Sequence, residues 1–129
     1  MQRVHHMPFG PEIGSDGIVF RLWAPTATRV DLILEQGAPL AMSQMNNGWF
    51  AVPAAGVTAG CRYRFRIDEN LIVPDPASRF QPDDVHGASQ VIDPRRFAWT
   101  DDRWRGREWH EAVIYELHVG AFTPEGSFA

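Results

Sequence analysis

The sequence predicts an all-β chain: an immunoglobulin-like β-sandwich, followed by a linker and the first strand of a truncated (β/α)8 barrel. Most apolar runs are short and alternate with polar residues, clusters of Gly, Pro, Asn and Asp separate them, and no segment before residue 100 has a helical period. Because one sheet alone would leave its apolar face in water, several strands at this spacing indicate two packed sheets.

The first two predicted strands show the alternation plainly. Residues 18–22 place three apolar side chains on one face and an arginine on the other, and Pro25 ends the strand. Residues 30–34 alternate in the same way. We expect the apolar side of both segments to face the core.

A hairpin and a long strand follow. Residues 46–48 (Asn-Asn-Gly) adopt positive φ at low cost, which predicts a tight turn between strands at 40–45 and 49–52. Residues 61–68 alternate throughout, with three arginines on the face opposite the apolar side chains, and the chain then turns back into a strand at 71–73.

The sequence predicts that the chain is divided into three parts. The sandwich extends over 1–94 and ends in a loop rich in Pro, Asp and Ser, and a Trp-rich connector covers 95–111. Residues 112–129 begin with the near-continuous apolar pattern of a strand buried on both faces. Such a strand needs neighbours and crossover helices, yet nine residues follow Gly120, so we expect a truncated piece of a longer protein.

Composition excludes several classes of protein. A formal charge of -4 with dispersed basic residues argues against a nucleic-acid partner. The single cysteine, Cys61, permits no internal disulfide, and residues 1–10 lack the apolar run of a signal peptide or anchor, so we expect a cytoplasmic protein with no membrane partner. No zinc-binding cysteine pair or phosphate-binding glycine loop is present, and we expect neither metal nor cofactor.

Several segments resemble a known family. Residues 20–25 (FRLWAP), 63–68 (YRFRID) and 74–79 (PDPASR) resemble the N-terminal carbohydrate-binding module 48 domain of enzymes in the α-amylase superfamily, glycoside hydrolase family 13. Residues 113–123 are similar to the first barrel strand of those enzymes. The segment 75–89 is most similar to the subgroup of trehalohydrolases that act on malto-oligosyltrehalose.

The resemblance implies a function for the parent protein. Such enzymes hydrolyse the α-1,4 bond that joins a terminal trehalose unit to a malto-oligosaccharide, with two carboxylates flanking that bond. Those carboxylates belong to later barrel strands, so we expect no catalytic residue here and an inactive fragment. The implied partners are the protein's own C-terminal catalytic barrel and a malto-oligosaccharide or malto-oligosyltrehalose. Two alternatives remain open: an independent glucan-binding module, or the N-terminal domain of a glycogen branching or debranching enzyme.

Four residues are candidates for carbohydrate contact: Trp49, Arg64, Arg79 and His86. Flat aromatic rings cover the apolar face of glucose, and polar side chains reach its hydroxyls. Each candidate has a structural alternative, since Trp49 could lie in the core, Arg64 on a solvated face, and Arg79 and His86 could hold their loop. In glycogen-binding relatives a tryptophan stands where this chain has Leu71.

Overall fold

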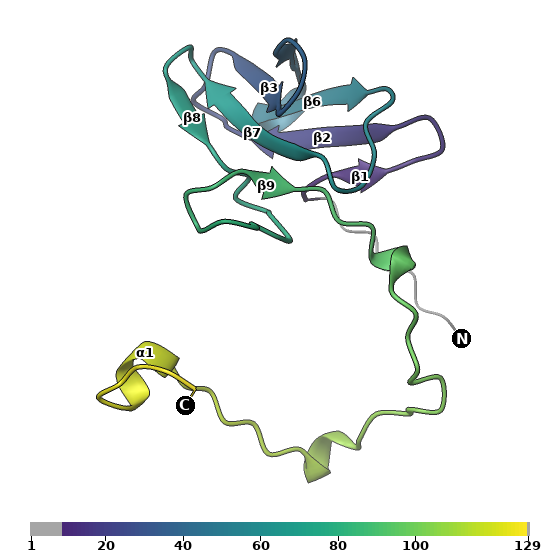
Figure 1. Cartoon of the computed structure of the whole chain (residues 1–129), viewed down its shortest axis with the longest axis vertical. Coiled ribbons are helices and arrows are strands. Elements are labelled where there is room, and N and C mark those ends of the chain that lie inside the picture. The colour runs from purple at the N-terminus through teal and green to yellow at the C-terminus, as the bar shows by residue number, and fades with distance from the viewer. Residues whose placement is uncertain (1–8, 129) are drawn as a thin grey trace. The chain divides into compact units, whose positions relative to one another are not determined.

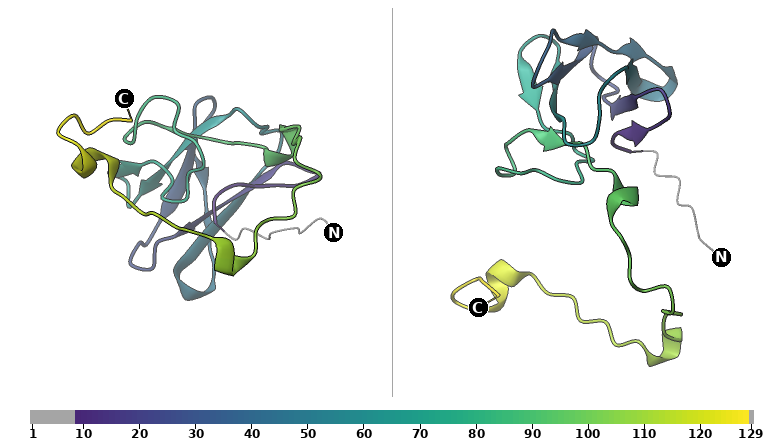
Figure 2. Two further views of the ribbon diagram at one scale, coloured as in Figure 1. Left: turned by 90° about the horizontal axis from the view of Figure 1, so that it is seen from below. Right: turned by 45° about the vertical axis from the view of Figure 1, so that its right-hand side comes forward.

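The computed structural model describes residues 9–128, and the chain divides into two units, Met1–Arg96 and Phe97–Ala129. Within the described residues all nine strands lie in the first unit, where they form two antiparallel sheets (Figures 1 and 2). The predicted pair of packed antiparallel sheets is confirmed.

The two sheets have different strand orders. The first sheet has the order β1-β2-β6-β5, and its strands are Glu12–Ile13 (β1), Ile18–Trp23 (β2), Trp49–Ala54 (β6) and Ser43–Gln44 (β5). The second sheet has the order β4-β3-β7-β8, with β9 pairing the start of β7, and its strands are Leu40–Ala41 (β4), Val30–Leu34 (β3), Arg62–Ile67 (β7), Leu71–Val73 (β8) and Ser89–Gln90 (β9).

The core lies between the sheets, where the alternation of each strand places its apolar side chains. Phe20 of β2 packs edge-on against Tyr63 of β7, with ring centroids 4.8 Å apart, and Tyr63 contacts Phe65 in the same manner at 5.8 Å. All three aromatic residues are buried. They join the two sheets at the centre of the domain.

The prediction of one strand over 40–45 is wrong. The chain pairs with β3 at β4 and then crosses to pair with β6 at β5, so this short run belongs to both sheets. Met42 lies at the crossing; its side chain is buried and its backbone N–H donates to the carbonyl of Val30. The crossing lets Met42 enter the core, an arrangement that alternation along one strand does not predict.

The predicted turn between β5 and β6 is confirmed. Residues Asn46–Gly48 form a single 3-10 turn (η1), with φ of 59° at Asn47 and 78° at Gly48. The carbonyl of Gly48 accepts a hydrogen bond from the N–H of Ala24, which places the turn against the end of β2. A Cβ at Gly48 would lie 2.6 Å from Cα of Pro25, so this position has room only for glycine.

The second unit contains no strand among the residues described. Residues 112–118 are extended without a pairing partner, Val113 is 95% exposed, and a short helix (α1) covers Val119–Phe122 where the sequence predicted the rest of a buried strand. Strands need neighbours to satisfy their N–H and C=O groups, and this unit supplies none. The assignment of 112–129 to a barrel stays a prediction.

The remaining helices are single 3-10 turns, Pro94–Arg96 (η2) and Trp109–Glu111 (η3). In the part of the chain that the structure describes, no helix has the length and apolar character that crossing a membrane requires.

Candidate functional site

A hollow of about 370 Å³ opens at one end of the first sheet. We call it the aromatic hollow, and its lining is mostly apolar. It is lined by Phe9, Gly10, Arg21, Leu22, Trp23, Trp49, Asp75, Pro76 and Ala77. Three of these nine residues are aromatic, and small-molecule sites are lined mostly by apolar and aromatic side chains.

The register of β2 and β6 creates the aromatic lining. Trp23 and Trp49 are direct cross-strand partners. Their strand neighbours Leu22 and Phe50 are buried in the core, so both tryptophans point away from it. The ring of Phe9 lies against Trp49, with centroids 5.6 Å apart and planes inclined by 36°. Trp49 is half-buried, whereas Trp23 is 58% exposed.

The turn at 46–48 fixes the more exposed ring. The indole N–H of Trp23 donates to the carbonyl of Asn47 over 2.9 Å. Its polar atom is therefore satisfied within the protein, and the flat apolar faces of the ring remain for other contacts.

Charged groups lie beside the aromatic side chains. Nη1 of Arg21 pairs with Oε2 of Glu12 across β1 and β2. Both side chains are partly exposed, with 34% and 44% of their surface accessible. Arg21 lines the hollow, and because a guanidinium carries five N–H donors, it places hydrogen-bond donors there.

A buried polar contact anchors the loop that forms the other wall. The hydroxyl of Tyr63 donates to Oδ2 of Asp75 over 2.7 Å, and Oδ1 of Asp75 accepts the N–H of Ala77, also at 2.7 Å. Ser89 Oγ accepts the N–H of Asp75. Burial raises the pKa of Asp75, although the hydrogen bonds oppose this, and burial together with the adjacent Asp75 carboxylate raises the pKa of Tyr63.

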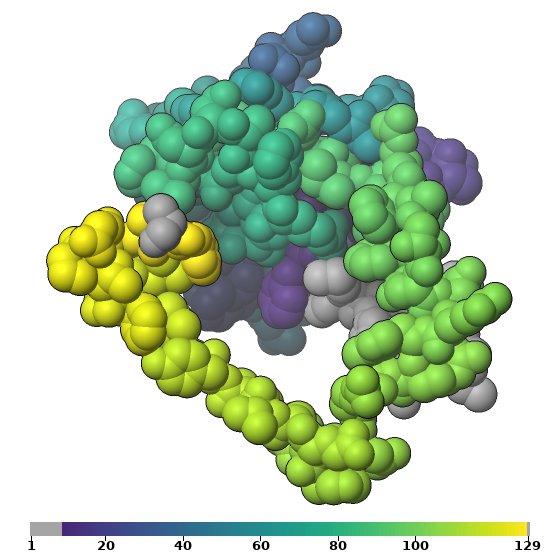
Figure 3. Space-filling view, turned by 60° about the horizontal axis from the view of Figure 1, so that its bottom comes forward, coloured from purple at the N-terminus to yellow at the C-terminus, as the bar shows by residue number. Residues whose placement is uncertain are grey.

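Arg79 ties the same loop to the N-terminal segment. Its Nη1 donates to the carbonyl of Pro11 at 3.0 Å and its Nη2 to the carbonyl of Phe9 at 3.1 Å. These contacts hold Phe9 against Trp49. Figure 3 shows the loop between β8 and β9 as a layer of teal-green atoms along one side of the first unit.

The outer face of the second sheet carries the three arginines of β7. Arg66 and Arg29 both bind the carboxylate of Asp31, whose side chain is 3% exposed. Burial raises the pKa of Asp31, but the hydrogen bonds and charges of Arg66 and Arg29 outweigh burial and bring it below its usual value of 3.8. Arg62 pairs with Asp83 at 3.1 Å.

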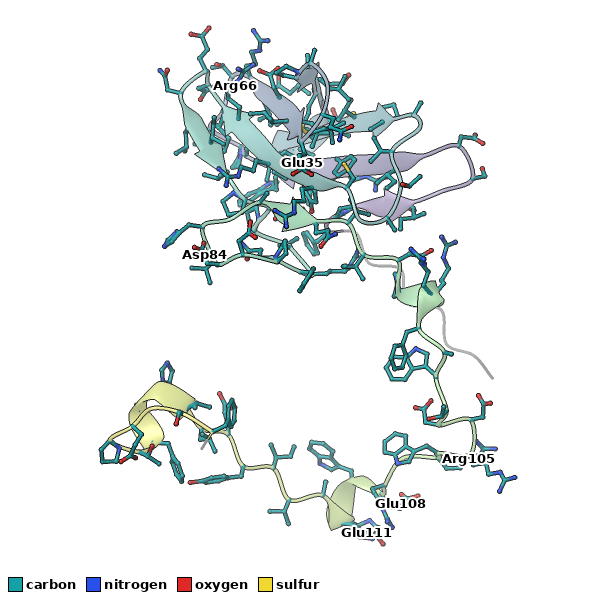
Figure 4. All side chains as sticks on the ribbon, in the orientation of Figure 1. Glu35, Arg66, Asp84, Arg105, Glu108 and Glu111 are labelled. Carbon is teal, nitrogen blue, oxygen red and sulfur yellow. The ribbon has the colours of Figure 1, made fainter. Side chains whose placement is uncertain are left out.

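Arg64 lines a smaller hollow on this face. The hollow has a volume of about 240 Å³ and is lined by Ile33, Leu34, Glu35, Arg62, Tyr63, Arg64, Asp83 and Ala88. Figure 4 shows Arg66 and Asp84 at opposite ends of this side, with Arg66 on β7 and Asp84 on the loop beside β9. Leu71, where glycogen-binding relatives have a ring, is 57% exposed.

The structure separates the four predicted contact residues. Trp49 and Arg79 both contact the N-terminal segment that contains Phe9. Arg64 points from the other sheet, on the opposite side of the core, and His86 is exposed on the loop, its N–H bonded to Oδ1 of Asp84. They therefore do not form one site.

The sequence pattern alone does not single out two members of the aromatic hollow. Trp23 ends a strand, so a core position is compatible with the sequence. Its place on the polar side of the alternation, however, indicates a side chain that points away from the core. Phe9 precedes every predicted strand. Only its contact with Trp49 assigns it to the site.

The fold and the aromatic hollow define a β-sandwich with a concave aromatic surface, a class that includes carbohydrate-binding domains. A family profile described as carbohydrate-binding module 48 (isoamylase N-terminal domain) matches residues 8–83, more than half of the chain. The chain belongs to this family.

Longer proteins match over nearly the whole chain. Malto-oligosyltrehalose trehalohydrolase from Saccharolobus solfataricus is 42% identical over 95% of the chain, and the enzyme of the same name from Arthrobacter ramosus is 46% identical over 84%. A crystal structure from Salmonella typhimurium, of a protein assigned as an alpha amylase, has 44% identity and a TM-score of 0.79 over 96% of the chain. The chain spans 22%, 19% and 21% of these proteins, about a fifth of their length.

Proposed function

We propose that this chain is the non-catalytic N-terminal domain of a glycosidase that releases trehalose from malto-oligosyltrehalose by hydrolysing an α-1,4 bond. The observation that carries the proposal is the high identity to trehalohydrolases across both the sandwich and the segment after it. The domain's partner is the catalytic barrel of the same protein, and its substrate contact is with malto-oligosaccharide.

The chemistry of the described residues supports an accessory role. Glycoside hydrolysis needs two carboxylates on either side of the scissile bond, one of them free to act as an acid. At the aromatic hollow, Asp75 is buried and bonded to Tyr63 and Ala77, and Glu12 is paired with Arg21. These groups hold the structure together, and we assign the reaction to the part of the protein that this chain does not include.

An independent glucan-binding role is the second candidate. The outward Arg64 beside the 240 Å³ hollow favours it, since a guanidinium can donate to sugar hydroxyls. The position of Leu71 argues against it, because an aliphatic side chain lacks the flat face that stacks on a pyranose ring.

Trehalose release tests the proposal. The longer protein that contains this chain should release trehalose from maltotriosyltrehalose, whereas residues 1–129 alone should show no turnover. An assay of branching on amylose, read from the iodine complex, serves as the matched control for the alternative reaction. Branching by the longer protein, or hydrolysis by the 129-residue chain, would contradict the proposal.

A further inference from the structure

We propose that the aromatic hollow is an α-glucan subsite in its own right, on the first sheet and separate from the arginine face of the second. The choice of α-glucan as ligand rests on the function proposed above. The site itself rests on the geometry of Phe9, Trp23 and Trp49.

The size of the hollow suits a short stretch of sugar. Its volume of about 370 Å³ lies at the lower end of the range of small-molecule sites, roughly 300–1,000 Å³. A glucose unit has apolar C–H faces and a polar edge of hydroxyls. The hollow reproduces this division, because its walls are mostly aromatic and aliphatic while the charged side chain of Arg21 also lines it.

The aromatic rings are held in place before any ligand binds. Trp23 is fixed by its bond to Asn47, and Trp49 is the cross-strand partner of Trp23 and lies against the ring of Phe9. Arg79 in turn fixes the backbone of Phe9. A preorganised site loses little conformational entropy on binding. The binding of a neutral sugar, which forms no ion pair, is therefore more favourable than at a flexible site.

Arg21 gives the hollow a polar group that suits a sugar. Its Nη1 donates to Oε2 of Glu12, and a guanidinium carries five N–H donors in all. The side chain is 34% exposed, so sugar hydroxyls can replace water at the guanidinium without burying an unpaired charge.

A titration of residues 1–129 with maltoheptaose tests the proposal. The five tryptophan indole N–H signals and the backbone amide signals are followed by ¹H-¹⁵N NMR, with cellohexaose as a comparison sugar. We expect saturable shifts of the Trp23 and Trp49 signals below about 10 mM maltoheptaose, and weaker response to cellohexaose. Absence of saturable shifts, or shifts confined to residues around Arg64, overturns the proposal while leaving the proposed function intact.

Substitutions locate the site. Trp23→Ala should weaken binding by about tenfold, and Trp23→Leu, which keeps apolar contact with its neighbours, should do the same if the flat ring is what matters. Trp109→Ala and Arg64→Ala are the controls, since Trp109 is 79% exposed in the second unit and Arg64 lies on the other sheet. Circular dichroism checks that each variant is folded.

Unchanged affinity in a folded Trp23→Leu variant overturns the proposal. Shifts of the Trp23 signal that depend on protein concentration and not on sugar also overturn it, because a second copy of the chain would then be the occupant. Failure of trehalose release by the longer protein would instead count against the proposed function, which this titration does not measure.

Discussion

The contact between Tyr63 and Asp75 is the most buried polar contact of the candidate site. It joins the centre of the core to the loop that walls the aromatic hollow. Tyr63→Phe leaves Oδ2 of Asp75 without its donor and should lower the free energy of unfolding by about 1–3 kcal/mol. Urea unfolding measures the loss, with Tyr115→Phe, an exposed tyrosine, as the matched control. Equal stability of the two variants would contradict this assignment.

Asp31 gives the domain a defined acid sensitivity. Its pKa is lower in the folded state than its usual 3.8, so the carboxylate stabilises the fold above that pH, and this contribution is lost as the pH falls through the lower, folded-state pKa. Asp31→Asn should cost about 1–3 kcal/mol at pH 7. The difference from wild type should shrink as the pH falls below 3.8 and through the lower, folded-state pKa.

Unfolding measured across pH checks this prediction. Glu116→Gln, at an exposed position of the second unit, is the matched control and should leave the whole profile unchanged. A constant difference between Asp31→Asn and wild type from pH 7 to pH 2 would show that the charge of Asp31 is not the source of the stabilisation.

Among the elements, the β5–β6 hairpin connects the fold to the candidate site. Its turn contacts Pro25 at the end of β2 and holds the ring of Trp23. Gly48→Ala should destabilise the protein by more than the roughly 1–2 kcal/mol that positive φ alone costs an alanine, because its Cβ would clash with Pro25.

Gly37→Ala isolates the backbone part of that cost. Gly37 also has positive φ, at 102°, and an added Cβ there would meet nothing within 4 Å. We expect Gly48→Ala to unfold at clearly lower denaturant concentration than Gly37→Ala and to reduce the shift of the Trp23 indole N–H signal on addition of sugar. An equal loss of stability in the two variants would mean that the turn can shift to accommodate the Cβ without disturbing β2.

For the molecule as a whole, the division into two units predicts where it is cleaved first. Arg103, Arg105 and Arg107 are in the second unit, outside any strand, whereas Arg62, Arg64 and Arg66 lie in β7. Protease cleavage requires local opening, and β7 is paired on both sides. Trypsin should therefore cut between residues 103 and 107 before it cuts β7.

Mass spectrometry of the timed digest checks this order of cleavage. The product that begins at the N-terminus should keep the near-ultraviolet circular dichroism of the packed core. Cleavage within β7 at the same rate would show that the sandwich opens as readily as the second unit.

Part of the candidate site could be predicted from sequence, and part could not. The sequence indicates Trp49 as a candidate for carbohydrate contact because a flat aromatic ring can cover the apolar face of glucose, and Trp49 lines the aromatic hollow. Arg64 is a candidate by resemblance, and it lies on the other sheet. The sequence does not indicate Trp23 as a contact residue. Its place in the hollow depends on pairing with Trp49, which is far away along the chain.

The sequence by itself determined the features that depend on near neighbours. Alternation over 18–22, 30–34 and 61–68 predicts which side chains face the core, and the Asn-Asn-Gly turn predicts the hairpin, because both follow from local backbone geometry.

Only the tertiary structure decided the features that depend on contacts between distant segments. The crossing at Met42 and the two-residue strands β1 and β9 exist because neighbouring strands supply their hydrogen-bond partners. The aromatic hollow likewise forms because the register of β2 and β6 pairs two outward tryptophans, and Arg79 brings Phe9 to them. No single segment contains the information for these contacts, because the energy that fixes them comes from packing across the whole sandwich.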